Sequence, residues 1–312
     1  MAKTKYWNVI KILLKLAFTT FLGWLVFQKI DFRQVTSIFM KSYPWYILAA
    51  WLSYFISQTL SSWRVLGFLN SIGLRLQFGF NFRLYMLGMF YNVFLPGGIG
   101  GDGYKIYLLK KKFQLPVKKI FLSLLLDRVS GLWAIFLLAA VLIFFIPYFQ
   151  NGEWWPVVMV MLATLLYYLL YRRYFFTYLQ NFIAAHGKAI LVQSLQLLSV
   201  FFILSSQDFK GNYFPYMFCF LLSSLATIIP LSIGGLGMRE YVMMVTSPLL
   251  SMNETLAVFT TLCFYILSTL TALPGIWFVY RSKEFDSMPG EKQAKAIKDG
   301  PEVVIHLHQH DP

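Results

Sequence analysis

Long apolar segments recur along the chain, and they limit the folds open to it more than any other feature. They cover residues 8–27, 43–60, 120–146, 155–171, 190–206 and 254–280. A helix that crosses the hydrocarbon core of a bilayer needs about 20 apolar residues. Hydrophobic residues make up 58% of the sequence and charged residues 13%, whereas a soluble domain carries about 25% charged residues. The sequence therefore predicts an all-α polytopic membrane protein with six full transmembrane helices.

Two further apolar segments, 78–112 and 214–248, are interrupted by glycine and proline. The first contains "LPGGIGGDGYK" and the second contains "IIPLSIGGLGMREYVMM". If residues 78–94 crossed the membrane fully, six lysines would follow on the outer side: Lys105, Lys110, Lys111, Lys112, Lys118 and Lys119. That arrangement violates the positive-inside rule when the basic N-terminus is cytoplasmic. A segment that enters to mid-depth and breaks at Pro96–Gly101 returns these lysines to the cytoplasm, so we predict a re-entrant hairpin.

The order of spans and interrupted segments contains a repeat. Residues 8–146 and 155–280 each hold three full spans and one interrupted segment, with Pro96 and Pro230 at corresponding places. Three crossings are an odd number, so the second unit is inverted and its hairpin enters from the opposite face. Inverted repeats with broken helices indicate a transport site near the bilayer midplane. We expect a transmembrane domain over 1–282, with both termini cytoplasmic, and a polar, disordered tail over 283–312.

The two breaks carry the first group of candidate binding residues. They are Asn92, Pro96, Gly97, Gly98, Gly100, Gly101, Asp102 and Lys105 in the first segment, and Pro230, Gly234, Gly235, Gly237, Arg239 and Glu240 in the second. Glycine lets a ligand approach the backbone closely, and the N-terminus of a half-helix attracts an anion such as a phosphate. Asp102 either caps the returning half-helix or binds a ligand. Asn92 either satisfies a freed carbonyl or contacts substrate. Arg239 faces a headgroup, whereas Glu240 pairs elsewhere.

Asp127 and Arg128 form the second candidate group, about two turns inside the third span. Ionisable residues within a span are costly to bury and often functional. The structural alternative is that Arg128 extends to the cytoplasmic interface while Asp127 pairs with a lysine of the preceding loop.

Several other chemistries find no support in the sequence. Cys219 and Cys263 lie in apolar runs without metal-ligand spacing, which indicates packing residues. The glycines after Leu95 lack the GK[ST] ending of a nucleotide-binding loop. The formal net charge of +14 suits cytoplasmic loops and anionic lipid better than nucleic acid in a chain of this kind. We therefore expect no enzyme activity, no metal and no cofactor. The segment "DFRQVTSIFMKS" predicts an amphipathic helix at the membrane interface.

Three motifs in order carry a family resemblance: "FYNVFLPGGIGGDGYKIYLLKK", "LLLDRVSGL" and "IIPLSIGGLGMREYVMM". They resemble the signature regions of the flippase-like family named after the lysylphosphatidylglycerol synthase transmembrane region. The resemblance covers roughly 8–282 and implies a protein of the bacterial or archaeal cell membrane. It implies the lipid-translocating part without the separate synthase domain, because only about 30 polar residues follow the last span. Asp127 stands where the family often has glutamate, which keeps the carboxylate.

The leading hypothesis is a translocator of an anionic phospholipid or lipid-linked headgroup across the cytoplasmic membrane. Membrane lipids are the expected partners, with a homo-oligomer or a lipid-synthesis enzyme as further partners and no nucleic acid. A transporter of a small soluble anion is one alternative, because the same hairpins would serve it. A membrane partner that assists a lipid-modifying enzyme without transport is the other.

Overall fold

The structure is a computed structural model that describes residues 32–94, 100–149, 155–228 and 235–280, together with Thr20, Phe21 and Trp24. This part of the chain is helical and contains no strand. The helices are α2 (Phe32–Lys41), α3 (Pro44–Ser71), α4 (Phe78–Phe94), α5 (Gly100–Phe113), α6 (Val117–Ile143), α7 (Trp155–Tyr174), α8 (Phe182–Ser205), α9 (Tyr213–Ala226), α10 (Met238–Thr246), α11 (Glu254–Ala272) and α12 (Gly275–Tyr280). Three short 3-10 turns join them: η1 (Pro147–Phe149), η2 (Phe176–Asn181) and η3 (Pro248–Leu250).

Four helical segments of the described chain are long and apolar enough to cross a membrane. They are Val117–Ile143, Trp155–Tyr174, Phe176–Ser205 and Glu254–Tyr280, and they agree with four of the predicted spans. The predicted span 43–60 belongs to α3, which has 28 residues but also a series of buried serines that lower its hydropathy. The predicted span 8–27 lies almost wholly outside the described residues. The chain is therefore a multi-pass, all-helical membrane protein.

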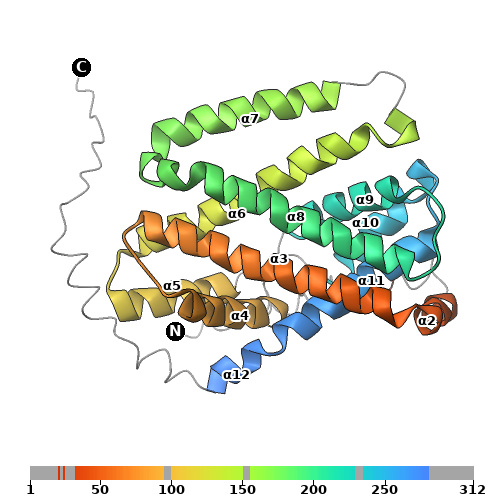
Figure 1. Ribbon diagram of the computed structural model, residues 1–312, viewed down its shortest axis with the longest axis horizontal. Coiled ribbons are helices and arrows are strands. Elements are labelled where there is room, and N and C mark those ends of the chain that lie inside the picture. Colours follow the sequence, from red (N-terminus) through yellow and green to blue (C-terminus); the bar gives the residue numbers. More distant parts are fainter. Residues whose placement is uncertain are drawn as a thin grey trace.

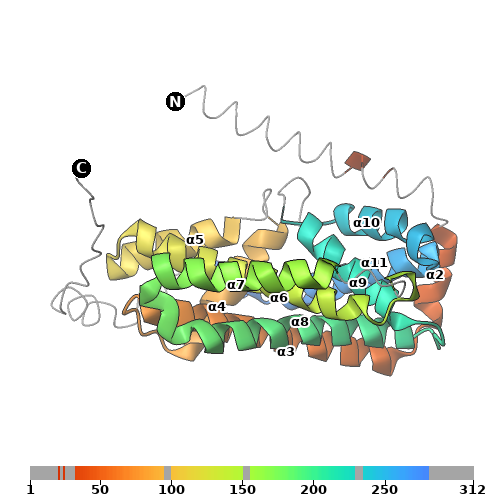
Figure 2. The ribbon, with the colours of Figure 1, turned by 90° about the horizontal axis from the view of Figure 1, so that it is seen from above.

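Both interrupted segments fold as pairs of packed helices. α4 packs against α5, and α9 packs against α10. The α4–α5 pair occupies one half of the long axis and the α9–α10 pair occupies the other half, with the described ends of the two pairs directed toward the middle (Figure 1). The view from above gives the same separation (Figure 2). The breaks predicted from the glycines therefore coincide with the ends of these helices, because α4 ends at Phe94 and α10 begins at Met238.

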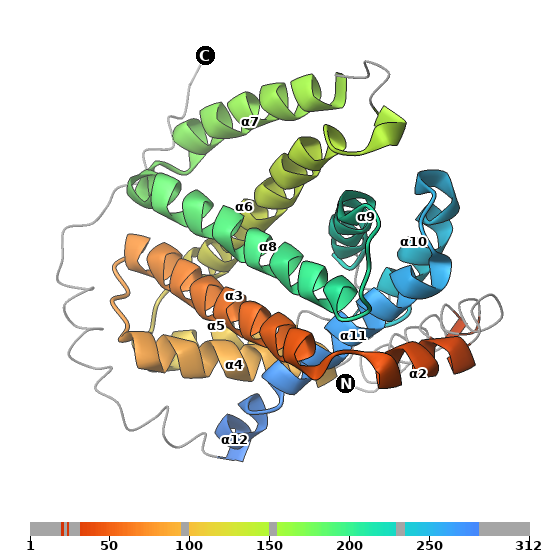
Figure 3. The same ribbon diagram turned by 45° about the vertical axis from the view of Figure 1, so that its right-hand side comes forward.

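The two helix pairs have corresponding neighbours. The α4–α5 pair packs on α3 and α6, whereas the α9–α10 pair packs on α8 and α11. α3 and α8 lie side by side and run in opposite directions through the centre of the molecule (Figure 3). Each pair also reaches the other half, because α4 contacts α11 and α9 contacts α6.

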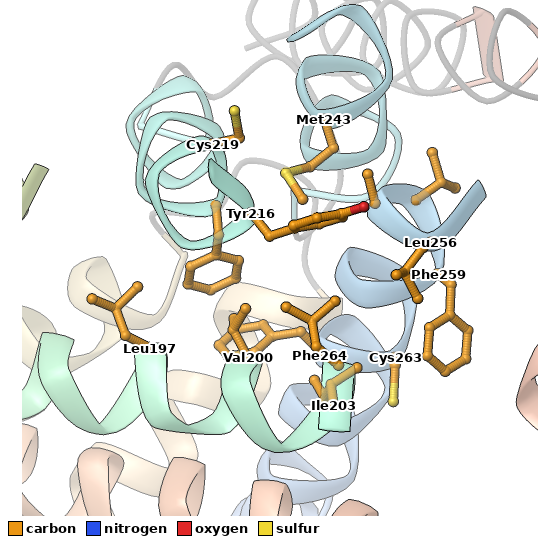
Figure 4. Close-up of a cluster of buried hydrophobic side chains, with 14 of the residues drawn as sticks. Leu197, Val200, Ile203, Tyr216, Cys219, Met243, Leu256, Phe259, Cys263 and Phe264 are labelled. Atoms are coloured by element: carbon orange, nitrogen blue, oxygen red, sulfur yellow. The ribbon is translucent and has the colours of Figure 1, made fainter. Parts of the chain in front are cut away.

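The largest buried cluster fills the space between α8, α9, α10 and α11 (Figure 4). Tyr216 and Cys219 of α9 meet Met243 of α10 there, next to Phe264 of α11. Cys219 and Cys263 are both buried and free, in agreement with the predicted packing role.

The molecule has one peripheral long helix and one packed amphipathic helix. α7 buries only Tyr171 and exposes apolar side chains over the rest of its length, and it lies at the edge of the molecule (Figure 3). The predicted amphipathic helix exists as α2, but it packs on α11: Val35 is buried and Phe39 meets the ring of Phe259 at 6.4 Å.

Candidate functional site

The α4–α5 pair is held by a close crossing of glycines. A Cβ atom on Gly101 would lie 2.0 Å from the carbonyl oxygen of Gly88, so this position requires glycine. Asn92 Oδ1 accepts a hydrogen bond of 2.9 Å from the amide of Gly101, which is otherwise an unpaired donor at the start of α5. Asn92 was expected to satisfy a carbonyl or to contact substrate. The structure instead uses it to cap α5 from the opposite helix.

Asp102 links α5 to α6. Its carboxylate accepts hydrogen bonds from Lys105 at 3.3 Å and from Arg128 at 2.5 Å. The side chain of Asp102 is 14% exposed and that of Lys105 7%, whereas that of Arg128 is 46% exposed. Lys105 also lies over the ring of Tyr85 at 4.7 Å and passes Gly88, where a Cβ atom would lie 2.4 Å from Lys105 Cε. Asp102 therefore pairs with two candidate cations, Lys105 and Arg128, and the second of these remains partly exposed.

Asp127 pairs with Arg64 of α3. Arg64 Nε donates to Asp127 Oδ1 at 2.7 Å, and Arg64 Nη2 donates to Oδ2 at 3.2 Å, so the pair is bidentate. Both side chains are buried. The expected alternative, a lysine of the loop before α6, is wrong. The physical reason is the length of α3, which continues to Ser71 and keeps Arg64 inside the helix bundle.

A polar stripe on α3 was missed by the sequence analysis. It consists of Ser53, Ser57, Gln58, Ser61 and Ser62, all buried. Two residues of α4 form hydrogen bonds with this stripe. Tyr85 donates to Gln58 Oε1 at 2.9 Å, and the Asn81 amide donates to the carbonyl of Ser62 at 2.7 Å. The sequence contains the pattern that predicts this stripe, because polar residues recur every three to four positions within an apolar segment. Such spacing places them on one face of a helix.

Arg239 is at the beginning of α10, two residues after a glycine turn. Gly235 and Gly237 have φ angles of +84° and +81°, which L-residues with a side chain rarely adopt. The Arg239 guanidinium carbon lies 5.5 Å from the ring centre of Phe220 and 5.4 Å from that of Phe264, and Nη1 donates to Ser224 Oγ at 3.2 Å. No carboxylate of the described residues lies within ion-pair distance of this guanidinium.

Glu240 faces away from Arg239, as expected for adjacent helical residues. Its Oε2 accepts a hydrogen bond of 2.7 Å from the amide of Gly237 and thereby caps α10. The residue is 2% exposed, and its Oε1 has no hydrogen-bond partner among the described residues. The expectation that Glu240 interacts with something other than its neighbour is therefore confirmed, with the backbone of the glycine turn as the partner.

A tyrosine lies next to each of the two charged groups. The ring of Tyr85 lies 4.7 Å from the Lys105 ammonium. The ring of Tyr54 meets that of Phe264 at 5.0 Å, and Phe264 also contacts Arg239. The structure thus brings Asn92, Gly101, Asp102 and Lys105 together with Asp127 and Arg128 at α4, α5 and α6, whereas Arg239 and Glu240 lie at the start of α10. Gly100 begins α5. Pro96, Gly97, Gly98, Pro230 and Gly234 lie outside the described residues.

The described residues contain no group of three histidine, cysteine, aspartate or glutamate side chains that could hold a metal ion. The hydrogen-bond donors of the candidate site are a lysine, three arginines and backbone amides, a donor set that suits an anion.

Comparison with known proteins gives one family. The model of the family described as "Lysylphosphatidylglycerol synthase TM region" matches residues 12–275. No match was found among curated proteins.

Proposed function

Because the chain belongs to the family of the lysylphosphatidylglycerol synthase TM region, a family of membrane proteins related to lipid metabolism, we propose that it is a lipid translocator. It moves an anionic phospholipid or lipid-linked headgroup across the cell membrane, and the proposal includes no catalytic step. One observation carries it: the Arg239 guanidinium lies over two adjoining phenyl rings and is paired with no carboxylate of the described residues. A cation held in this way can bind a phosphate bidentately.

The proposed membrane arrangement has six full spans and two re-entrant hairpins. α3 has 28 residues and is about 42 Å long at 1.5 Å per residue, more than a hydrocarbon core of about 30 Å. Counting α3 and the apolar segment 8–27 with the four apolar helices gives six spans. The α4–α5 and α9–α10 pairs have corresponding neighbours in opposite halves of the molecule, which supports an inverted repeat.

The charges of the site favour a monoanionic headgroup. Four cations, Arg64, Lys105, Arg128 and Arg239, face three carboxylates, Asp102, Asp127 and Glu240. One positive charge remains when all are ionised, and a phosphodiester carries one negative charge. Bringing an unpaired charge to the centre of a bilayer costs at least several kcal/mol. Arg239 offsets part of this cost, because no carboxylate of the described residues lies within ion-pair distance of its guanidinium.

Arg128 offers a second contact for the headgroup. Its guanidinium binds Asp102 but is nearly half exposed, and a phosphate can replace a carboxylate as its partner. Such an exchange releases α5 from α6, because the Asp102–Arg128 pair connects these two helices. The headgroup therefore changes the packing of the α4–α5 hairpin when it binds.

The test is lipid movement in proteoliposomes of phosphatidylcholine that contain a trace of fluorescent phosphatidylglycerol. The purified protein should exchange this lipid between leaflets faster than protein-free vesicles do. Arg239→Ala should lower the initial rate by on the order of tenfold or more, because the lost neutralisation exceeds about 1.4 kcal/mol. Arg239→Lys should keep part of the rate, since it retains the charge but not the fork of donors.

The matched control is Arg173→Ala, an exposed arginine at the end of α7, which should leave the rate unchanged. Equal rates for the wild type and Arg239→Ala contradict the proposal. Uptake of free glycerol phosphate without lipid movement supports the soluble-anion transporter instead. Absence of both activities, with co-purification of a lipid-modifying enzyme, supports the partner role.

A further inference from the structure

Glu240 has a free buried oxygen that the headgroup site does not use. The side chain is 2% exposed, Oε2 is engaged by the amide of Gly237, and Oε1 has no partner among the described residues. A buried carboxylate oxygen without a hydrogen bond or a cation is costly while it carries charge. A proton on Oε1 removes the charge and leaves the cap at Oε2 in place.

The groups around Glu240 are few and almost all neutral. α10 packs against α9, α11 and η3. The titratable side chains that α9 and α11 bring to this cluster are Tyr213, Tyr216, Cys219 and Cys263, which are uncharged near neutral pH. The η3 turn brings none. Thr261 of α11 lies beside the carboxylate, but its hydroxyl donates to the carbonyl of Val258 at 3.1 Å. Arg239 is the charged group that acts on Glu240.

The surroundings fit a proton better than a metal cation. A sodium or calcium ion is held by several oxygens, about six or more in the case of calcium. Oε1 has one neighbouring hydroxyl, which is committed to Val258, and the described residues form no acidic cluster. A proton needs a single lone pair, which Oε1 supplies.

We propose that Glu240 is a proton-binding site that couples lipid movement to a proton gradient, with one proton on Oε1 for each headgroup held by Arg239. The inference rests on the proposed function. Arg239 is the residue next to Glu240 and stabilises its ionised form. A phosphate bound to Arg239 cancels this effect, so headgroup binding favours protonation of Glu240. By reciprocity, protonation strengthens headgroup binding by the same factor, and the lipid and the proton therefore move in the same direction.

The test is the leaflet distribution of fluorescent phosphatidylglycerol in phosphatidylcholine proteoliposomes after a step of one pH unit across the membrane. Wild-type protein should accumulate the lipid in the leaflet on the less acidic side, up to about tenfold for one proton per lipid. Glu240→Gln should not accumulate the lipid on either side under the same step. The glutamine keeps an oxygen that accepts the Gly237 amide hydrogen, so the cap of α10 persists.

Three results overturn the inference. They are a wild-type distribution that ignores the pH step, a Glu240→Gln variant that responds as the wild type does, and a distribution that follows a sodium gradient at constant pH. The first and third require no variant. Glu254→Gln, in the first turn of α11, is the matched control and should respond as the wild type does.

Infrared spectroscopy of the reconstituted protein separates this inference from the proposed function. The band of a protonated carboxyl group should appear as the pH falls, and Glu240→Gln should lack it. If the band titrates but no lipid moves in any vesicle, the proton site stands and the translocator fails. If lipid moves but the variant's infrared titration equals that of the wild type, the translocator stands and the proton site fails.

Discussion

Arg64 and Asp127 form a deeply buried ion pair, with less exposure than the pairs that Asp102 makes with Lys105 and Arg128. Their side chains are 6% and 11% exposed. Two parallel hydrogen bonds satisfy the carboxylate, whereas Arg64 Nη1 has no partner among the described residues. Desolvation of both charges offsets much of their attraction, so the pair adds little net stability over an apolar pair of the same size. Its effect is specificity, because α3 and α6 can dock at this level only with both charges in register.

Asp127→Asn should destabilise the protein by about 3–5 kcal/mol, because it leaves the Arg64 charge buried and unpaired. Thermal unfolding in detergent measures the change. The double variant Arg64→Leu/Asp127→Leu should recover most of the loss. Asp208→Asn breaks an exposed pair with Lys210 at 3.5 Å and should be close to neutral. A loss for Asp208→Asn as large as for Asp127→Asn would contradict the assignment of the effect to burial.

The sequence identified the charged residues of the site but not their partners. Asp127, Arg128 and Arg239 stood out because a charge within an apolar segment is unusual. Which cation meets Asp127 depends on the rotation of α3 about its axis, and the register between distant helices is not encoded in the spacing of either one. The expected span ended at residue 60 and therefore left out Arg64. The true end of α3, eleven residues later, changes its environment from water to the protein interior.

At the scale of the elements, the glycines of α4 and α5 differ in whether they lie at a close contact between the two helices. Gly88 and Gly101 allow the backbones of the two helices to approach closely, as small residues do at helix contacts in membranes. Gly103, two positions further along α5, would place a Cβ atom in open space. The close approach of α4 and α5 therefore depends on particular glycines rather than on glycine content.

Gly101→Ala should separate α4 from α5, because the new methyl group meets the Gly88 carbonyl oxygen at 2.0 Å. Overpacking of this kind costs about 1–3 kcal/mol or more. Gly103→Ala should be neutral or stabilise α5 by about 0.5–1 kcal/mol, because alanine favours a helix interior. Thermal unfolding of both variants in the same detergent makes the comparison. Equal loss for the two variants would mean that helix propensity, not contact, decides the effect.

The sequence predicted the positions of the helix ends better than the contacts between helices. Apolar periodicity and glycine placed the breaks of both hairpins within a few residues, because these signals are local. The hydrogen bond from Gly101 to Asn92 and the polar contacts between α3 and α4 join residues on different helices. These hydrogen bonds depend on which helix faces pack together, and the spacing of residues within one helix does not determine that packing.

At the scale of the whole molecule, the two hairpins differ in charge. The α4–α5 hairpin brings Lys105 and Asp102 to α6 and its Arg128, whereas the α9–α10 hairpin brings Arg239 without an acidic partner. Under the proposed function, a headgroup would meet a cation without a carboxylate partner at one hairpin and an exchangeable ion pair at the other. An arrangement of this kind would serve alternating access, because the two halves of the molecule would bind the headgroup differently.

The proposed re-entrant arrangement predicts which ends of the α4–α5 and α9–α10 pairs share a side of the membrane. Arg75 precedes α4 and Lys110 lies near the end of α5, both exposed, so cysteines at these positions should react with a membrane-impermeant thiol reagent from the same side. Cysteines in place of Lys210, before α9, and Ser251, after α10, should react from the opposite side. Cys219 and Cys263 are buried and give little background. Labelling of Arg75→Cys and Lys110→Cys from opposite sides would mean that α4 and α5 together cross the bilayer, and the lysines after the first break would then lie outside, against the positive-inside rule.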